Sequence, residues 1–265
     1  MLSVKDLNVC YGAIHAIHDV SLEVHDGEIV SLIGANGAGK TTILHTITGL
    51  KKAKSGSVTY NDADLLKTDP SKIITLGVAH VPEGRHIFPG MTVEENLEMG
   101  AYIRKDDLSA SIKEVYERFP RLKERRRQLA GTLSGGEQQK CAIAKVLLSE
   151  PRVLLLDEPT KGLDAYSKRN LQTLLSELRR DGLTLLLVTH DVEFAAENAD
   201  RCALFFDGEV FAAASPGQFF SGNSFYTTVA SRMARRIWRG AVTCDDVVSR
   251  CLSYDARSAQ DGKEV

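Results

Sequence analysis

Short apolar runs alternate with polar turns along the chain and predict a sheet flanked by helices. Apolar and polar positions alternate at residues 2–9 and 17–24, which predicts two strands with one exposed face. Continuous apolar runs predict buried strands at residues 28–33, 77–82, 152–156 and 184–189. Because helical patterns separate most of these runs, we expect an α/β protein with a mostly parallel sheet and an antiparallel β edge subdomain.

A helical lobe interrupts the strand pattern. Residues 92–128 are largely helical in pattern, and residues 138–149 form a strong helical stretch. We therefore expect a lobe at about residues 83–150, inserted into a domain that extends over residues 1–230.

The C-terminal tail is expected to comprise residues 231–265. Its first part, residues 231–238, is a basic helical stretch that ends at the only tryptophan, Trp238. The chain after Tyr254 is polar, which predicts that the tail is partly disordered.

Composition excludes several classes of function. The 265 residues are 43% hydrophobic, which supports one large domain, and a formal net charge of −2 argues against a nucleic-acid partner. Five scattered cysteines without a C-x-x-C pair indicate free thiols rather than disulfides or a zinc site. No apolar run is long enough to span a bilayer, so we expect a soluble cytoplasmic chain whose membrane component, if any, comes from other chains.

The strongest chemical signal is the phosphate-loop pattern G-x-x-x-x-G-K-[ST] at residues 34–41. It lies between a predicted strand and a predicted helix, which is the context that the motif requires. Glycines let backbone N–H groups approach phosphate oxygens, and the N-terminus of the following helix adds partial positive charge. Lys40 would reach the β- and γ-phosphates, and the Thr41 hydroxyl would take a place on Mg²⁺. The sequence therefore predicts a P-loop NTPase core that binds a nucleoside triphosphate.

Acidic residues and a histidine follow two other predicted strands. Asp157 is placed to hold Mg²⁺, and Glu158 is placed to orient an attacking water molecule. The alternative, two acids that cap a strand turn, is disfavoured by the phosphate loop in the same chain. His190 can hydrogen-bond a γ-phosphate or, alternatively, cap the next helix.

A second anion site is predicted where Ser134, Gly135 and Gly136 precede a helix. One chain with two such sites suggests that the second binds a phosphate held elsewhere. Tyr11 lies at an exposed bend, where it can stack on an adenine ring or pack as a surface tyrosine.

These motifs and their order resemble the ATP-binding subunit of ABC transporters. The features that carry the resemblance are Tyr11, the phosphate loop, Leu-Ser-Gly-Gly-Glu at 133–137, the pair Asp157-Glu158, the turn from Lys161 to Asp164, and His190. The resemblance covers nearly all of residues 1–230 and implies the ABC ATPase fold, with ATP as the nucleotide and Mg²⁺ as the metal ion.

The resemblance also implies roles for the matching residues. Tyr11 would stack on adenine, Thr41 and Asp157 would hold Mg²⁺, Glu158 would be the catalytic base, and His190 would contact the γ-phosphate. The positions that would hold the phosphates are Gly34, Ala35, Asn36, Gly37, Ala38, Gly39, Lys40, Thr41 and Thr42.

Other implied contacts involve a second molecule. Ser134, Gly135 and Gly136 would act in trans on ATP held by an opposing protomer, and Asp164 would lie at the dimer interface. The resemblance further implies two transmembrane permease subunits, an identical or related second ATPase protomer, and an extracytoplasmic or membrane solute-binding component. The chain would bind peripherally at the cytoplasmic face of the cell membrane.

One position departs from the wider family. The loop between core and lobe usually carries glutamine, and this chain has Glu83, which we expect to contact both the nucleotide and Mg²⁺. The surrounding Val-Pro-Glu-Gly-Arg at 81–85 and the stretch at 91–97 are similar to the second ATPase subunit of branched-chain amino-acid importers.

The second half of the chain is similar to a different subgroup. From about Gln139 it resembles ATPases of energy-coupling-factor importers for vitamins or metal ions such as cobalt, at residues 160–164, 191–196 and 219–228. In this family the lobe mainly selects the membrane partner, so we prefer branched-chain amino acids as the solute.

Two other functions are weaker alternatives. Soluble ABC proteins of translation or repair generally have two fused cassettes or a long coiled-coil insert, and this chain has neither. An α/β protein with a decayed site is disfavoured because Glu83 is the one unusual residue among the catalytic positions.

Overall fold

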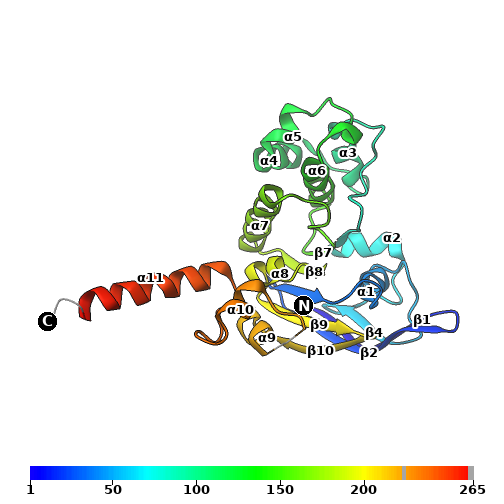
Figure 1. Ribbon diagram of the computed structural model, residues 1–265. Helices are drawn as coiled ribbons and strands as arrows, with labels where there is room; N and C mark the ends of the chain where they lie inside the picture. The colour runs from blue at the N-terminus through cyan, green and yellow to red at the C-terminus, as the bar shows by residue number, and fades with distance from the viewer. Residues whose placement is uncertain (223–224, 262–265) are drawn as a thin grey trace.

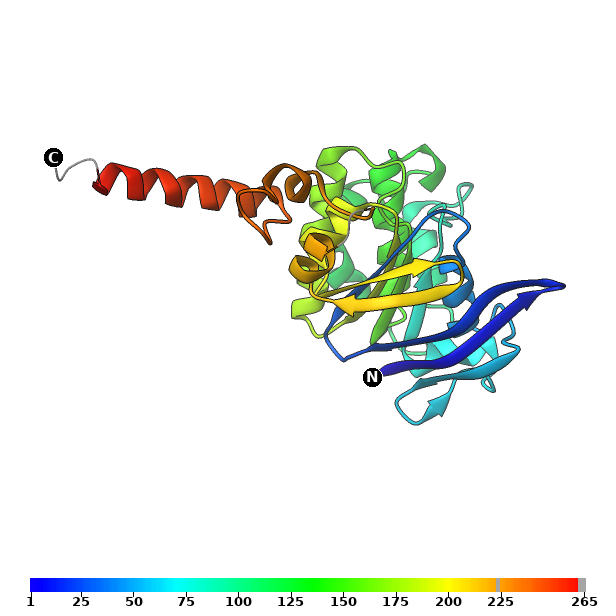
Figure 2. The ribbon, with the colours of Figure 1, turned by 60° about the horizontal axis from the view of Figure 1, so that its bottom comes forward.

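The computed structural model describes residues 1–222 and 225–261 of the chain. Asn223 and Ser224, which belong to the stretch at 219–228, and residues 262–265 lie outside this part. A sheet core carries a helical lobe on one side, and a long C-terminal helix extends away from the core (Figures 1 and 2). In the described ranges, helices that combine the length and the apolar character needed to cross a membrane are absent.

The central sheet has six strands in the order β10-β9-β3-β8-β7-β6. They are β3 (Ile29–Ile33), β6 (Val78–Val81), β7 (Val153–Asp157), β8 (Thr184–Thr189), β9 (Arg201–Phe206) and β10 (Glu209–Ala214). All neighbours pair in parallel except β10, which pairs antiparallel with β9. Every residue of β3, β7 and β8 is buried, as expected for parallel strands covered on both faces. The carboxyl ends of these three strands therefore meet at one edge.

A second, antiparallel sheet has the strand order β2-β1-β4-β5. Its strands are β1 (Leu2–Tyr11), β2 (Ile14–Val24), β4 (Ser55–Tyr60) and β5 (Ala63–Asp64). Apolar residues of this sheet pack with helix α1 (Lys40–Ile47) against one face of the central sheet. The predicted fold class, a mostly parallel core with an antiparallel edge subdomain, is confirmed.

The helical lobe lies between β6 and β7. Its helices are α3 (Val93–Gly100), α4 (Ser109–Arg118), α5 (Pro120–Glu124), the 3₁₀ helix η2 (Ala130–Thr132) and α6 (Gly135–Leu147). Before β6 the chain also forms the short helices α2 (Pro70–Ile73) and η1 (Ile74–Leu76). Helix α3 begins with a capping box in which Thr92 and Glu95 exchange hydrogen bonds.

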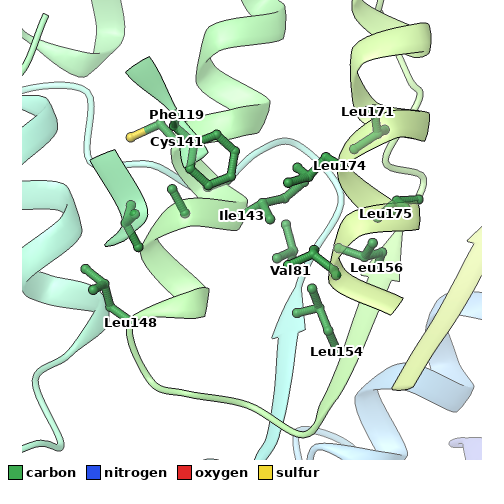
Figure 3. Packing of buried hydrophobic residues seen from close by; sticks show 14 of the residues in the cluster. Val81, Phe119, Cys141, Ile143, Leu148, Leu154, Leu156, Leu171, Leu174 and Leu175 are labelled. Atoms are coloured by element: carbon green, nitrogen blue, oxygen red, sulfur yellow. The ribbon is translucent and has the colours of Figure 1, made fainter. Parts of the chain in front are cut away.

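One apolar cluster joins the lobe to the other face of the central sheet. Figure 3 shows Phe119, Cys141 and Ile143 of the lobe together with strand residues such as Leu154. Leucines of helix α7 (Ala165–Arg180) complete the same cluster. Burial raises the pKa of Cys141 to about 11, so this thiol stays neutral and packs as a small apolar group.

Gly100 brings helix α3 into close contact with α6. A Cβ atom at this position would lie 1.8 Å from the carbonyl oxygen of Lys145. We therefore expect Gly100→Ala to lower the free energy of unfolding by about 1–3 kcal/mol, the usual range for overpacking, although alanine ordinarily stabilises a helix. Chemical denaturation measures the change. The matched control is Gly90→Ala, whose Cβ would meet no atom within 4 Å. A Gly100→Ala protein as stable as wild type would contradict this packing.

The last helices are α8 (Val192–Asn198), α9 (Pro216–Gly222), α10 (Val229–Ala234) and α11 (Cys244–Asp261). Helix α10 ends at Ala234, four residues before Trp238, so the basic helical stretch predicted at 231–238 is only partly helical. Helix α11 continues past Tyr254, where the polar sequence predicted disorder. Figure 1 shows α11 projecting from the core.

Candidate active site

The loop between β3 and α1 has a backbone path that requires glycine. Gly39 precedes α1 with φ of 110°, and a Cβ atom there would lie 2.7 Å from the carbonyl oxygen of Ala16. At Gly34 a Cβ atom would lie 2.1 Å from the carbonyl oxygen of Phe205. These contacts seat the loop against β2 and β9, which leaves its N–H groups and the start of α1 available to an anion.

Lys40 is the cation of this loop. Its side chain is 5% exposed, and Nζ donates hydrogen bonds to the carbonyl oxygens of Gly34 at 2.7 Å and Ala35 at 2.9 Å. Burial lowers the pKa of Lys40, and nearby carboxylates, Glu158 first among them, oppose the lowering. In this structure the Lys40 ammonium bonds to carbonyl oxygens of its own loop. A bound phosphate would compete with these oxygens for the ammonium group.

Asp157 ends strand β7 beside the phosphate loop. Its side chain is buried, and neither carboxylate oxygen has a hydrogen-bond partner within the described part of the chain. Burial raises the pKa of Asp157, and the nearby Thr41 hydroxyl offsets part of this rise. The two groups do not form a hydrogen bond in this structure. Two orphaned carboxylate oxygens near a hydroxyl are the hard oxygen donors that Mg²⁺ prefers.

A site for Mg²⁺ at Thr41 and Asp157 fits this donor set. Over the residues that the structure describes, groups of three or more potential ligands among histidine, cysteine, aspartate and glutamate are absent. Mg²⁺ is usually held by one or two carboxylates together with phosphates and water rather than by a complete protein cage. The pair Thr41 and Asp157 therefore suits an ion that arrives with a phosphate ligand.

Glu158 is oriented by donors on β8 and its following turn. Its Oε2 atom lies 2.8 Å from Nδ1 of His190 and accepts from the backbone N–H of His190 and the hydroxyl of Thr189. Its Oε1 atom is buried 3.9 Å from the Lys40 ammonium and has no hydrogen-bond partner in the described ranges. Glu158 also has φ of 46°, a strained value for a residue with a side chain. The donors at Oε2 leave Oε1 as the carboxylate oxygen without a hydrogen-bond partner in the described ranges.

An open cleft of about 480 Å³ brings half of the predicted residues together. The predicted residues that line it are Tyr11, Asn36, Gly37, Gly39, Lys40, Thr41, Thr42, Glu83 and Glu158. Ala16 and Lys161 line it too, and sequence reasoning did not assign either to the site. Lys161 stands three residues after Glu158 in the turn that was recognised as a motif, so position alone was the available signal.

Tyr11 lies at the end of β1 and is 44% exposed. The ammonium of Lys51 lies 3.8 Å from the centre of its ring, and its hydroxyl is 3.5 Å from the hydroxyl of Thr42. A base that stacks on this face of the ring would replace Lys51.

Glu83 and Lys161 form a close ion pair at the margin of the cleft. Oε1 of Glu83 bonds to Lys161, and within the described residues no hydrogen bond joins Glu83 to Thr41 or Asp157. Its charge nevertheless acts on Lys40 and Asp157, so Glu83 belongs to the same electrostatic site.

The second predicted anion site lies elsewhere. Ser134, Gly136 and Asp164 line a cleft of about 360 Å³ that shares no lining residue with the first. Ser134 caps α6 through a capping box with Glu137. Asp164 caps α7 by accepting a hydrogen bond of 2.7 Å from the backbone N–H of Ser167.

Gly135 lies beside the guanidinium of Arg85, where a Cβ atom would be 2.8 Å from Nη2. The start of α6 therefore combines a helix N-terminus with a nearby cation, a combination suited to an anion. The two clefts share no lining residue, so neither cleft of the described chain joins Lys40 to the start of α6.

Comparison with known sequences gives two main results. The family model described as "ABC transporter" matches residues 17–161, over half of the chain. The chain is 47% identical over 211 residues to the high-affinity branched-chain amino acid transport ATP-binding protein BraG of Pseudomonas aeruginosa. This match covers 79% of this chain and 91% of that protein. It also matches longer putative ABC transporter ATP-binding proteins of Bacillus species, of which it spans 43% or less.

Solved structures with the same fold include cbiO1 from Clostridium perfringens, part of the ABC transporter complex cbiONQ. It has a TM-score of 0.76 and 27% identity, and the match covers 89% of this chain and 95% of that one. A dimeric ATP-binding cassette in a post-hydrolysis state with ADP and phosphate has a TM-score of 0.74 and 28% identity, over 82% of this chain and 99% of that one.

Proposed function

The chain belongs to the ABC transporter family, and from this premise we propose that it is the ATP-hydrolysing subunit of an importer for branched-chain amino acids. The observation that carries the solute class is its 47% identity to BraG over 91% of that protein. The chain and cbiO1 share a fold at a TM-score of 0.76, but their sequences are 27% identical. This similarity supports a shared cassette architecture more than a shared solute.

ATP binding is assigned to the first cleft. The N–H groups of the phosphate loop and the start of α1 bind the phosphates, and Lys40 exchanges its two carbonyl partners for phosphate oxygens. Tyr11 packs against the adenine ring. Thr41 and Asp157 would hold Mg²⁺, which supplies charge neutralisation at the β- and γ-phosphates.

Glu158 and His190 perform the hydrolytic step in this proposal. Oε1 of Glu158 accepts a hydrogen bond from water, while the three donors at Oε2 fix the carboxylate. A neutral His190 that donates from Nδ1 to Glu158 has no second N–H for a phosphate. Contact with the γ-phosphate therefore requires His190 to release Glu158 or to take up a second proton.

The separate second cleft supports action on a second protomer. We propose that Ser134, Gly135 and Gly136 bind the γ-phosphate of ATP held at the first cleft of the opposing chain, with Asp164 at the interface. Two chains would then close over two ATP molecules and reopen after hydrolysis. The dimeric cassette with ADP and phosphate, at a TM-score of 0.74, supports this arrangement as a precedent.

In a transporter this cycle would drive two transmembrane permease subunits, with solute delivered by an extracytoplasmic or membrane solute-binding component. The chain would act at the cytoplasmic face of the cell membrane. Its second ATPase protomer would be a copy of itself or a related chain.

Affinity purification of the tagged chain from detergent-solubilised membranes, with mass spectrometry, tests this proposal. We expect a pair of branched-chain-type permease subunits, and we expect a strain without the chain to lose uptake of labelled leucine, isoleucine and valine. Wild-type protein should restore uptake, and the Glu158→Gln variant should not. Recovery of a single energy-coupling transmembrane subunit, with loss of vitamin or cobalt uptake instead, would contradict the solute class.

A further inference from the structure

The ion pair between Glu83 and Lys161 has no role in the mechanism above. It joins residues 78 positions apart in the sequence, and both residues line the nucleotide cleft. The side chains are 41% and 59% exposed, so the pair contributes little to folding stability. Its position at the cleft points instead to an effect on what binds there.

A second contact fixes the same two segments. Nη2 of Arg85 donates to the carbonyl oxygen of Gly162 at 3.3 Å, and Nη1 donates to Oε1 of Gln138 at 3.3 Å. Residues 83 and 85 are thus tied to residues 161 and 162. Two separate side-chain contacts therefore hold the segment with Glu83 next to the segment with Lys161.

The balance of charges at the cleft explains why the orientation of the Glu83 carboxylate matters. Three carboxylates act at the cleft, those of Glu83, Asp157 and Glu158. Lys40 and Lys161 offset two of them. If Lys161 were neutral, the free Glu83 carboxylate would face a polyphosphate that is itself strongly negative, and it would compete for any cation bound at Asp157.

We propose that Lys161 is a positioning residue that holds and neutralises Glu83, so that a nucleoside triphosphate and its metal ion bind at Thr41 and Asp157 without a third competing carboxylate. This inference rests on the proposed ATP-binding function. Lys161 acts through Glu83 and does not itself contact the phosphates.

A double-mutant cycle tests the proposal by equilibrium binding of a fluorescent N-methylanthraniloyl ATP. We expect Lys161→Met to weaken binding about fivefold when residue 83 is glutamate, the size expected for one charge interaction near a protein surface. In the Glu83→Gln background the same change should weaken binding less than about twofold. The loss should be larger in EDTA than with Mg²⁺, because the free nucleotide is more negative than its Mg²⁺ complex.

The matched control is Lys67→Met. Lys67 forms an exposed ion pair with Asp64 at 2.7 Å and lies outside the cleft, so its removal should leave nucleotide affinity unchanged. Equal losses from Lys161→Met in both backgrounds would show direct contact with the phosphates and overturn the proposal. Unchanged affinity in both backgrounds would overturn it as well. Failure of the wild-type chain to bind the nucleotide would instead overturn the proposed function.

Discussion

Glu158→Gln lowers steady-state ATP turnover at least about 100-fold, while MgATP affinity stays within about threefold of wild type. Glutamine keeps the shape of the side chain and an oxygen acceptor, but it has no negative charge to accept a proton from water. The donors that hold Oε2 in the structure, His190 and Thr189, can hold the amide oxygen in the same way. Binding and hydrolysis should therefore separate in this variant.

Release of phosphate measures turnover, and equilibrium binding of MgATP measures affinity. Glu117→Gln is the matched control, because Glu117 is 64% exposed on the lobe and its ion-pair contact, with Lys113, is 3.9 Å long. Its turnover should equal that of wild type. Normal turnover in Glu158→Gln would remove Glu158 as the base and require another acceptor for the proton of the attacking water.

Lys40→Ala weakens MgATP binding by about 30-fold, because it removes the fixed cation from the phosphates. The ammonium is 5% exposed and lies within reach of the carbonyl oxygens of Gly34 and Ala35, so the loop loses both its cation and an internal brace. Tyr11→Ala should weaken binding only about fivefold, since a stacked aromatic contributes about 1 kcal/mol.

Isothermal titration with MgATP compares the two variants. Thermal unfolding without nucleotide serves as the check that Lys40→Ala is folded under the assay conditions. Equal affinity in Lys40→Ala and Tyr11→Ala would mean that the nucleotide does not lie along the phosphate loop as described.

Sequence patterns predicted most of the fold because the central strands β3, β7 and β8 are short and mostly apolar. Strands β3, β7 and β8 are buried at every residue, so the continuous apolar runs of the sequence match the burial in the structure. Parallel strands also place their carboxyl ends at one edge, and for this reason the sequence predicts that Lys40, Glu158 and His190 lie together.

The structure added contacts that no local pattern contains. The pairing of Glu83 with Lys161 spans 78 positions and depends on how the loop into the lobe lies across the sheet. Likewise, the placement of Gly135 beside Arg85 follows from packing of α6 against that loop. No periodic pattern in the sequence predicts either contact.

Helix α11 was missed although a local signal was present. Thr243 and Asp246 fit the capping-box spacing, and in the structure Asp246 accepts from the N–H of Thr243 while its own N–H donates to the Thr243 hydroxyl. The polar composition of the tail favours disorder, whereas this start signal favours a helix.

The most direct test of the account is the mass of the Glu158→Gln variant in sedimentation velocity, with and without MgATP. The central claim is that two chains close over ATP by joining the phosphate loop of one to the Ser134–Gly136 cleft of the other. The account predicts a 29.0 kDa monomer without nucleotide or with ADP, and a species of twice that mass with MgATP. A monomer under every condition, both for the chain alone and for its mixture with a related ATPase protomer, or a dimer indifferent to nucleotide, would contradict it.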